Sequence, residues 1–132
     1  MRKLANRFSF AAILFAAICT LAQSPRTTSA TVIRGWLSDE DCARGRAESG
    51  VFTATSPRCA KECVAKGKKI VLIEPERKMI FDISNQQVAR KNVGDYVEIA
   101  GSINLNAKTV SIGSMKMLTR GTASCSRPAL KN

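Results

Sequence analysis

The apolar residues beyond position 31 occur in short segments, and this pattern constrains the fold more than any other feature of the chain. Several segments alternate apolar and polar side chains, which is the period of a half-buried β-strand. Five segments fit strands of this kind: residues 32–38, 70–73, 79–83, 96–105 and a last one around Val110 and Ile112. Pro75 marks a turn between the second and third segments, which predicts a hairpin. The pattern as a whole predicts a mainly β domain.

The last segment changes phase along its length. Met115 and Met117 lie one residue out of step with Val110 and Ile112. A β-bulge near Gly113 would return the methionines to the inward face, and glycine is a typical residue for such a bulge.

We expect the five strands to form a small OB-like barrel, with one short helix inserted between strands one and two. Closure suits a chain of 132 residues because it removes exposed sheet edges. Gly35 and Gly101, which are interior to their strands, are expected to be bend points at the corners of the barrel. The alternative is an open α+β sheet with the helix on one face.

The inserted helix has clear start and stop signals. Ser56 is a good N-cap, Pro57 suits the first helical position, and Gly67 suits a left-handed C-terminal cap. Between them, helical spacing puts two cysteines and two small apolar residues on one face: Cys59, Ala60, Cys63 and Val64. Residues 39–55 have no sustained periodicity, and we expect them to form a long loop.

The first 22 residues have the pattern of a signal peptide. A basic start is followed by an apolar stretch over residues 8–22, which is too short for a stable membrane-spanning helix. Cleavage after Ala22 is expected, with cleavage after Ala30 as the alternative. An uncleaved anchor and a lipoprotein modified at Cys19 are further alternatives. The chain is therefore expected to be exported, to the periplasm or beyond the cell, without a transmembrane span after cleavage.

Cleavage divides the chain and changes its charge. Residues 1–22 are the expected signal peptide, 23–31 a polar leader, 32–118 the OB-like domain and 119–132 a flexible tail. The precursor has 21 Lys and Arg against 10 Asp and Glu, a net charge of +11. The signal contains three of the positive charges, so the mature chain has 18 against 10, or +8.

Four cysteines remain after cleavage, an even number of the kind that forms disulfides in exported proteins. The disulfide candidates are Cys42, Cys59, Cys63 and Cys125. We expect Cys42 to pair with one of the two helix cysteines and so to fasten the long loop. One alternative is a metal site formed by Cys42, Cys59 and Cys63 with Asp39 or Asp41. Another is a redox thiol at Cys59, near the helix N-terminus.

Several of these motifs together resemble a known family. They are Gly35-Trp36-Leu37-Ser38-Asp39 with Cys42 following, the pair Cys59 and Cys63, the Ile-Val-Leu-Ile run, and the segment from Gly94 to Ile103. Over roughly residues 32–118 the chain resembles small secreted bacterial proteins of a domain-of-unknown-function family abundant in acidobacteria. The resemblance implies an exported OB-like domain and implies no activity. Members often carry a His before the first helix cysteine, whereas residues 53–58 here contain none.

The chain contains no His, which excludes His-based triads, His-ligated zinc sites and His acid–base pairs. It also lacks a phosphate-binding loop and a nucleophile paired with a base. We therefore expect a non-catalytic protein without a cofactor, acting as a binding or structural module.

Basic residues gather on and after the predicted helix: Arg58, Lys61, Lys66, Lys68 and Lys69. Such a cluster is typical of a solvated face, and it can also attract an anionic surface or polysaccharide. Nucleic acid is not an expected partner, because only Trp36 and Tyr96 offer themselves as stacking residues. The sequence thus predicts an exported module of unknown ligand, with polyanion binding as its possible activity and thiol-dependent metal binding or redox chemistry as the alternative.

Overall fold

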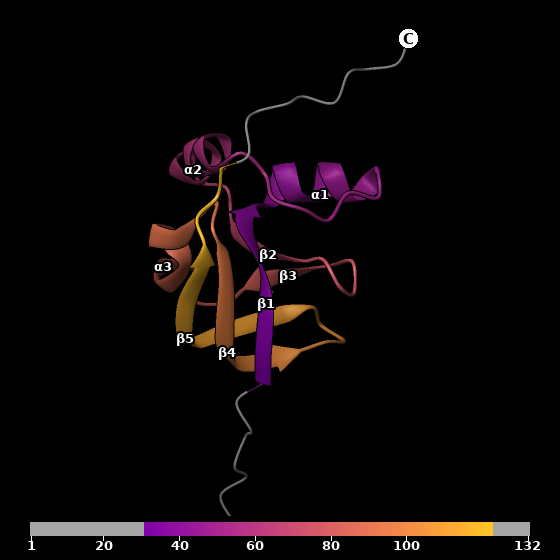
Figure 1. Ribbon diagram of the computed structural model, residues 1–132, viewed down its shortest axis with the longest axis vertical. Helices are drawn as coiled ribbons and strands as arrows, with labels where there is room; N and C mark the ends of the chain where they lie inside the picture. The colour runs from indigo at the N-terminus through magenta and orange to yellow at the C-terminus, as the bar shows by residue number, and fades with distance from the viewer. Residues whose placement is uncertain (1–30, 123–132) are drawn as a thin grey trace, which may run out of the picture.

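The computed structural model describes residues 31–122, which form a mainly β structure with a few short helices (Figure 1). The elements follow one another as β1 (Thr31–Asp39), α1 (Glu40–Glu48), α2 (Pro57–Ala65), β2 (Ile70–Glu74), β3 (Met79–Ile83), α3 (Gln86–Ala89), η1 (Arg90–Asn92), β4 (Tyr96–Asn104) and β5 (Thr109–Thr119). The predicted signal peptide, most of the leader, and residues 123–132 of the predicted tail lie outside this range. Within it, no helix is long and apolar enough to cross a membrane.

The five strands form one mixed sheet whose hydrogen bonds close into a ring. The neighbours in the ring are β1, β2, β3, β5 and β4, and β4 pairs again with β1. All pairs are antiparallel except β3 with β5, which run parallel through Asp82 with Thr109 and Ile83 with Val110. The two halves of β1 pair with different neighbours: residues 31–36 pair with β4, and residues 36–39 pair with β2.

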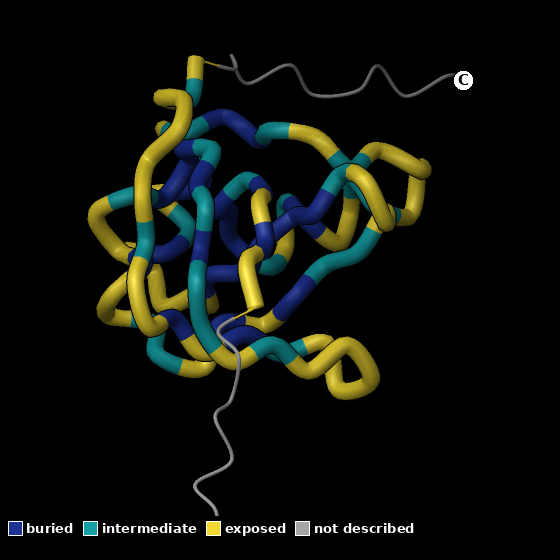
Figure 2. Tube along the Cα trace, turned by 60° about the horizontal axis from the view of Figure 1, so that its bottom comes forward, coloured by how far each residue is buried: buried dark blue, intermediate teal, exposed yellow. Residues whose placement is uncertain are grey.

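The main core fills the inside of this ring. It is built from inward-facing residues of all five strands together with the buried faces of α2 and α3, including Leu37, Phe81, Ile99, Ala60 and Ala89. Figure 2 shows the buried segments of the chain gathered toward the middle of the molecule, with exposed turns at the periphery. A second, smaller cluster lies on the outer side of the sheet, where Ala43 of α1 packs against Val71 and Ile73. Every residue of β2 is buried as a result, which explains its uninterrupted apolar run.

The bulge predicted in the last strand is confirmed. The register between β4 and β5 shifts where Ala100 faces Ser114 and Gly101 faces Ile112, so Gly113 is the extra residue. Met115 then packs against the main core, as the prediction required, whereas Met117 remains 43% exposed. A second shift follows closer to the end of the strand, between Tyr96 and Val97.

The expected loop over residues 39–55 was wrong in its first half, which is the helix α1. Asp39 caps the helix, and Glu40 and Asp41 in the first turn and Arg46 in the last turn suit the helix dipole. Only Ala43 of this helix is buried, so the segment lacks the apolar periodicity by which helices are usually recognised. The structure therefore has two helices, not one, between the first and second strands.

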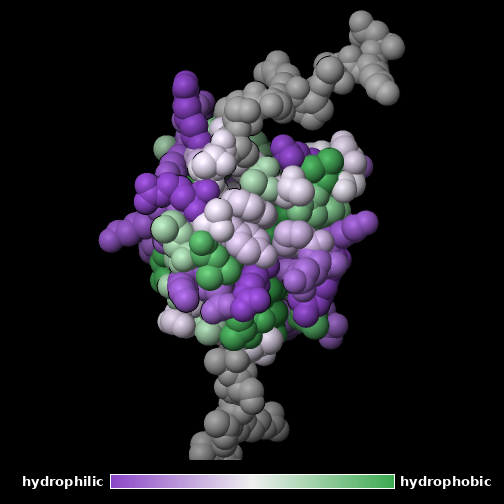
Figure 3. All heavy atoms as spheres, viewed as in Figure 1, coloured by the Kyte–Doolittle hydropathy of each residue, from purple (hydrophilic) through white to green (hydrophobic). Residues whose placement is uncertain are grey.

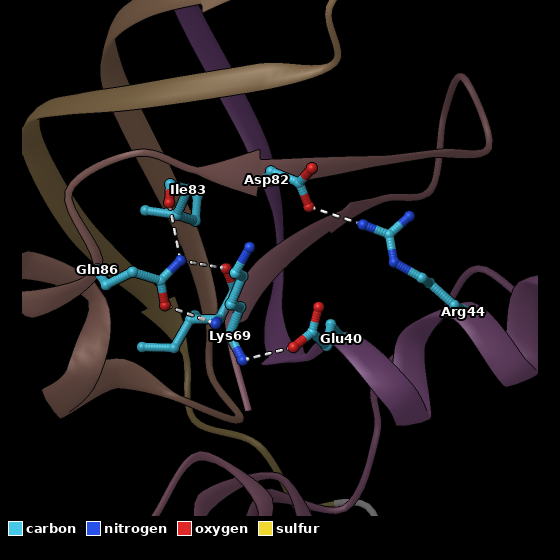
Figure 4. Close-up of polar contacts among 7 residues, drawn as sticks. Glu40, Arg44, Lys69, Asp82, Ile83 and Gln86 are labelled. Atoms are coloured by element: carbon cyan, nitrogen blue, oxygen red, sulfur yellow. Dashed lines mark hydrogen bonds and ion pairs between the residues drawn. The ribbon is translucent and has the colours of Figure 1, made fainter. Parts of the chain in front are cut away.

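The hairpin at Pro75 and the start and stop signals of the helix between Ser56 and Gly67 are confirmed. Ser56 caps α2, Pro57 begins it, and Gly67 follows it with a φ of 96°. Residues 84–94 contain the short helices α3 and η1. Gln86 at the start of α3 ties two strands together, because its side-chain amide bonds to both backbone groups of Ile70 and to the carbonyl of Ile83 (Figure 4).

Candidate functional site

Asp39 ends β1 and caps α1. Its Oδ1 accepts a hydrogen bond from the backbone N–H of Cys42 at 3.0 Å. The residue is fully buried, and its Oδ2 has no hydrogen-bond partner among the described residues. Buried carboxylate oxygens nearly always have a partner, so this atom is exceptional.

Two cysteines approach Asp39 from different helices. Cys42 lies in the first turn of α1, and Cys63 lies toward the end of α2, whose buried residues Ala60 and Val64 anchor it to the core. Both sulfurs and a carboxylate oxygen of Asp39 lie within 4.8 Å of one another. Both thiols are free and half-buried. We refer to Asp39, Cys42 and Cys63 as the Asp39 cluster.

The environment of Cys42 opposes loss of its proton. Partial burial raises the pKa of the Cys42 thiol to about 12, and the neighbouring Asp39 and Cys63 contribute to the same effect. A thiol of this kind is a poor nucleophile at neutral pH, because the thiolate is the reactive form.

The structure brings together part of the cysteine set predicted from the sequence. Cys59 belongs to the predicted helix face but not to the Asp39 cluster, and it is disulfide-bonded. Asp41 is turned away and forms an ion pair with Lys68 at 2.7 Å. Cys125 lies outside the described residues. The free thiols of the described range are therefore those of Cys42 and Cys63, so the structure does not form the predicted disulfide between Cys42 and a helix cysteine.

The predicted basic patch is partly neutralised. Arg58 pairs with Glu62 at 3.1 Å, and Lys68 pairs with Asp41. Asp41 raises the pKa of Lys68 through their hydrogen bond and their charges. Lys61, Lys66 and Lys69 are exposed and form no ion pair within residues 31–122. Figure 3 shows hydrophilic residues spread over this view of the molecule, with small hydrophobic patches between them.

A different basic site, which the sequence did not indicate, lies between α1 and the β2–β3 and β4–β5 turns. It is a hollow of ≈ 440 Å³ lined by Arg44, Ala47, Glu48, Phe52, Lys78, Met79, Ile80 and Lys108. Its lining combines an apolar surface with three cations and one carboxylate. We refer to it as the α1 hollow.

Two similar turns supply the lysines of the α1 hollow. Residues 75–78 connect β2 to β3, and residues 105–108 connect β4 to β5. The last residue of each turn is a lysine in the left-handed conformation, with a φ of 54° for Lys78 and 53° for Lys108. The side chain of the residue before each turn stabilises the turn by a hydrogen bond. Glu74 accepts one from the backbone N–H of Arg77, and Asn104 accepts one from the backbone N–H of Ala107. Each turn ends in a lysine, but nothing in the sequence shows that the fold brings these two lysines together.

Of the aromatic residues between positions 31 and 122, only Phe52 lines the hollow. Trp36 and Tyr96 contact each other across β1 and β4, with ring centroids 4.9 Å apart and planes inclined by 50°. Phe81 is part of the main core. Phe52, by contrast, packs against the small outer cluster and also lines the α1 hollow.

No protein-family model, curated protein or solved structure matches this chain in comparisons with known proteins. The resemblance to the acidobacterial family therefore stays a prediction from the sequence motifs.

Proposed function

We propose that the chain is an exported, non-catalytic binding module on an OB-like barrel, which holds an anionic polysaccharide in the α1 hollow. The ring order β1-β2-β3-β5-β4, with a helix between β3 and β4, supports the OB-like assignment. Proteins of that fold bind oligosaccharides and oligonucleotides on the face of strands two and three, flanked by the loops after strands one and four. The α1 hollow occupies the corresponding region, between α1, β3 and the β4–β5 turn.

The observation that carries this proposal is the placement of Lys78 and Lys108 at one hollow. A residue other than glycine in the left-handed conformation costs about 1–3 kcal/mol, and such residues gather at ligand sites. Here both turns adopt that conformation at a lysine. Neither lysine forms an ion pair with any residue of the described range, so both charges are available to a ligand.

The rest of the lining suits a sugar chain better than a free inorganic anion. Phe52, Met79 and Ile80 provide an apolar surface for the faces of sugar rings, which are less polar than their edges. Arg44 forms an ion pair with Asp82 at 2.7 Å (Figure 4). Its charge is therefore partly neutralised, and its guanidinium offers hydrogen-bond donors in a fixed position. The excess of positive charge over the whole chain attracts polyanions from a distance.

The test compares two double substitutions that remove the same charge. K78Q with K108Q changes the α1 hollow, and K61Q with K66Q changes the exposed basic patch on α2. The wild-type protein is expected to be retained on an immobilised sulfated polysaccharide at low salt and released as the salt concentration rises, because salt screens the attraction.

The hollow variant is expected to be released at a clearly lower salt concentration than the patch variant. An immobilised neutral polysaccharide controls for affinity that does not depend on charge. Equal release of the two variants would assign the attraction to overall charge and would contradict a site in the α1 hollow.

A further inference from the structure

The Asp39 cluster lies apart from the α1 hollow and has its own chemistry. Its three side chains come from three elements: the end of β1, the first turn of α1 and the end of α2. We propose that Asp39, Cys42 and Cys63 form a site for a thiophilic divalent cation of the Zn²⁺ class, with the fourth coordination position open.

The spacing of the three groups fits such an ion. Tetrahedral zinc has Zn–S distances of about 2.3 Å and Zn–O distances of about 2.0–2.2 Å, which puts neighbouring ligand atoms roughly 3.5–3.8 Å apart. The ligand atoms of the Asp39 cluster lie within 4.8 Å of one another, so a contraction of at most roughly 1.0–1.3 Å would close the site.

The unpartnered oxygen of Asp39 is an independent indication of a missing ligand. A buried polar atom without a partner costs free energy, and a native protein retains one where a bound ion or a function uses it. The backbone N–H of Cys42 already bonds to Oδ1, which fixes the carboxylate and leaves Oδ2 unused. A cation would complete this carboxylate without disturbing the helix cap.

The same cation would change the state of the two thiols. A coordinated thiol loses its proton outright, because the charge of the metal reverses the local balance. Each thiol would therefore release one proton on binding, and two thiolates with one carboxylate would face one divalent charge. Such a donor set favours Zn²⁺ over Mg²⁺ or Ca²⁺, which prefer oxygen ligands.

This ligand set differs from the one suggested by the sequence. Cys59 is engaged in a disulfide and Asp41 in an ion pair with Lys68, so neither belongs to the cluster. Three protein ligands with an open fourth position are the pattern of sites that bind a further molecule or water, whereas closed structural zinc sites have four. The partial exposure of both cysteines provides the route of access.

The experiment measures metal binding by the full chain, reduced at Cys42 and Cys63 and stripped of metal by a chelator. Zn²⁺ is titrated in competition with a chromophoric chelator, and Co²⁺ serves as a spectroscopic substitute. We expect one Zn²⁺ per chain and a thiolate-to-cobalt charge-transfer band. C42S and C63S should each weaken that band and lower Zn²⁺ affinity by at least about tenfold, the lower end of the range seen even for ligand-supporting residues.

D39N is the decisive variant, and D41N is its matched control. Asparagine caps a helix as well as aspartate does, so D39N keeps α1 while replacing a ligating oxygen by an amide. D41N removes the same charge from the first turn of α1 without touching the cluster. We expect at least about a tenfold loss of Zn²⁺ affinity in D39N and no change in D41N.

Three results would overturn the proposal. They are failure of the reduced chain to bind Zn²⁺, equal affinities of D39N and D41N, and isolation of the exported protein with Cys42 and Cys63 joined as a disulfide although Zn²⁺ was present in the medium. The circular dichroism spectrum of each variant shows that a loss of binding is not a loss of fold.

Discussion

At the scale of single residues, two glycines decide how closely the strands can approach. A side chain at Gly35 would meet the backbone carbonyl of Ile73, and one at Gly101 would meet that of Ser111. The sequence suggested them as bend points, and the structure shows a different role, because no side chain fits at either position. Backbone atoms cannot rotate away from a new methyl group, so the strands themselves would have to move.

We therefore predict that G35A lowers the free energy of unfolding by about 1–3 kcal/mol, the usual cost of overpacking. Gly45 is the matched control, because it lies in α1, where a new Cβ would have nothing within 4 Å and alanine favours a helix. G45A should raise stability by up to about 1 kcal/mol. Urea denaturation of both variants measures the difference, and equal midpoints would contradict the close approach.

The raised pKa of Cys42 leads to a prediction about its reactivity. Its thiolate fraction stays small until the pH approaches about 12, so alkylation should keep accelerating with pH well beyond the ordinary thiol value of 9.0. D39N removes a negative charge next to the thiol, which lowers the pKa and should speed alkylation at pH 8.

Mass spectrometry of the peptide that contains Cys42 measures this rate in the metal-free, reduced chain. The C63S background removes the second free thiol of residues 31–122, and D41N again serves as the control. A rate that levels off near pH 9 would contradict a buried, carboxylate-flanked thiol.

At the scale of elements, the side-chain amide of Gln86 makes hydrogen bonds to the backbone of two strands, as a neighbouring strand would. Its Oε1 accepts from the N–H of Ile70 at 2.6 Å, and its Nε2 donates to the carbonyls of Ile70 and Ile83 at 2.9 and 2.7 Å (Figure 4). The start of α3 is thereby fastened to the beginning of β2 and the end of β3. Glutamate has the same shape but cannot donate when ionised.

We predict that Q86E destabilises the protein by about 1–3 kcal/mol, because two carbonyls lose their donor and face a carboxylate. The neighbouring Gln87 is exposed, and Q87E adds the same charge without touching a strand end. Thermal unfolding should therefore separate Q86E from wild type and leave Q87E close to it. Equal melting temperatures of Q86E and Q87E would show that the bridge contributes little.

At the scale of the whole molecule, the strands and α2 could be predicted because their signals are local. Alternation, the Ser56-Pro57 start and the Gly113 bulge each depend on residues a few positions apart. Helix α1 was not predicted because it buries only Ala43 and so has no apolar periodicity. Its N-cap Asp39 begins the acidic run 39–41, which is equally typical of a loop.

The candidate sites could be predicted only in part, since both join distant segments. Cys42 was predicted to lie beside one of the two helix cysteines, with Asp39 or Asp41 nearby. The structure selects Cys63 and Asp39, because Asp39 ends β1 with its side chain buried. Lys78 and Lys108 belong to different hairpins, and no local pattern relates them. Their meeting depends on the ring order, in which β3 pairs with β5.

That pairing of β3 with β5 has a consequence for how the molecule opens. The ladder joins only two residue pairs, and it is extended by Asn85, whose side-chain amide exchanges two hydrogen bonds with the backbone of Ile112 at 2.8 and 2.9 Å. The β4–β5 ladder, in contrast, runs along the whole of β4 and nearly all of β5.

We therefore expect hydrogen–deuterium exchange to be faster at the N–H groups of Ser84 and Ile112 than at those along the middle of β4, and faster still in N85A. Uniform protection around the ring would contradict this. Local opening of the β3–β5 ladder turns the closed sheet into an open one with two unpaired edge strands. The lifetime of that open form then sets how often proteases, or a second copy of the chain, can reach those edges.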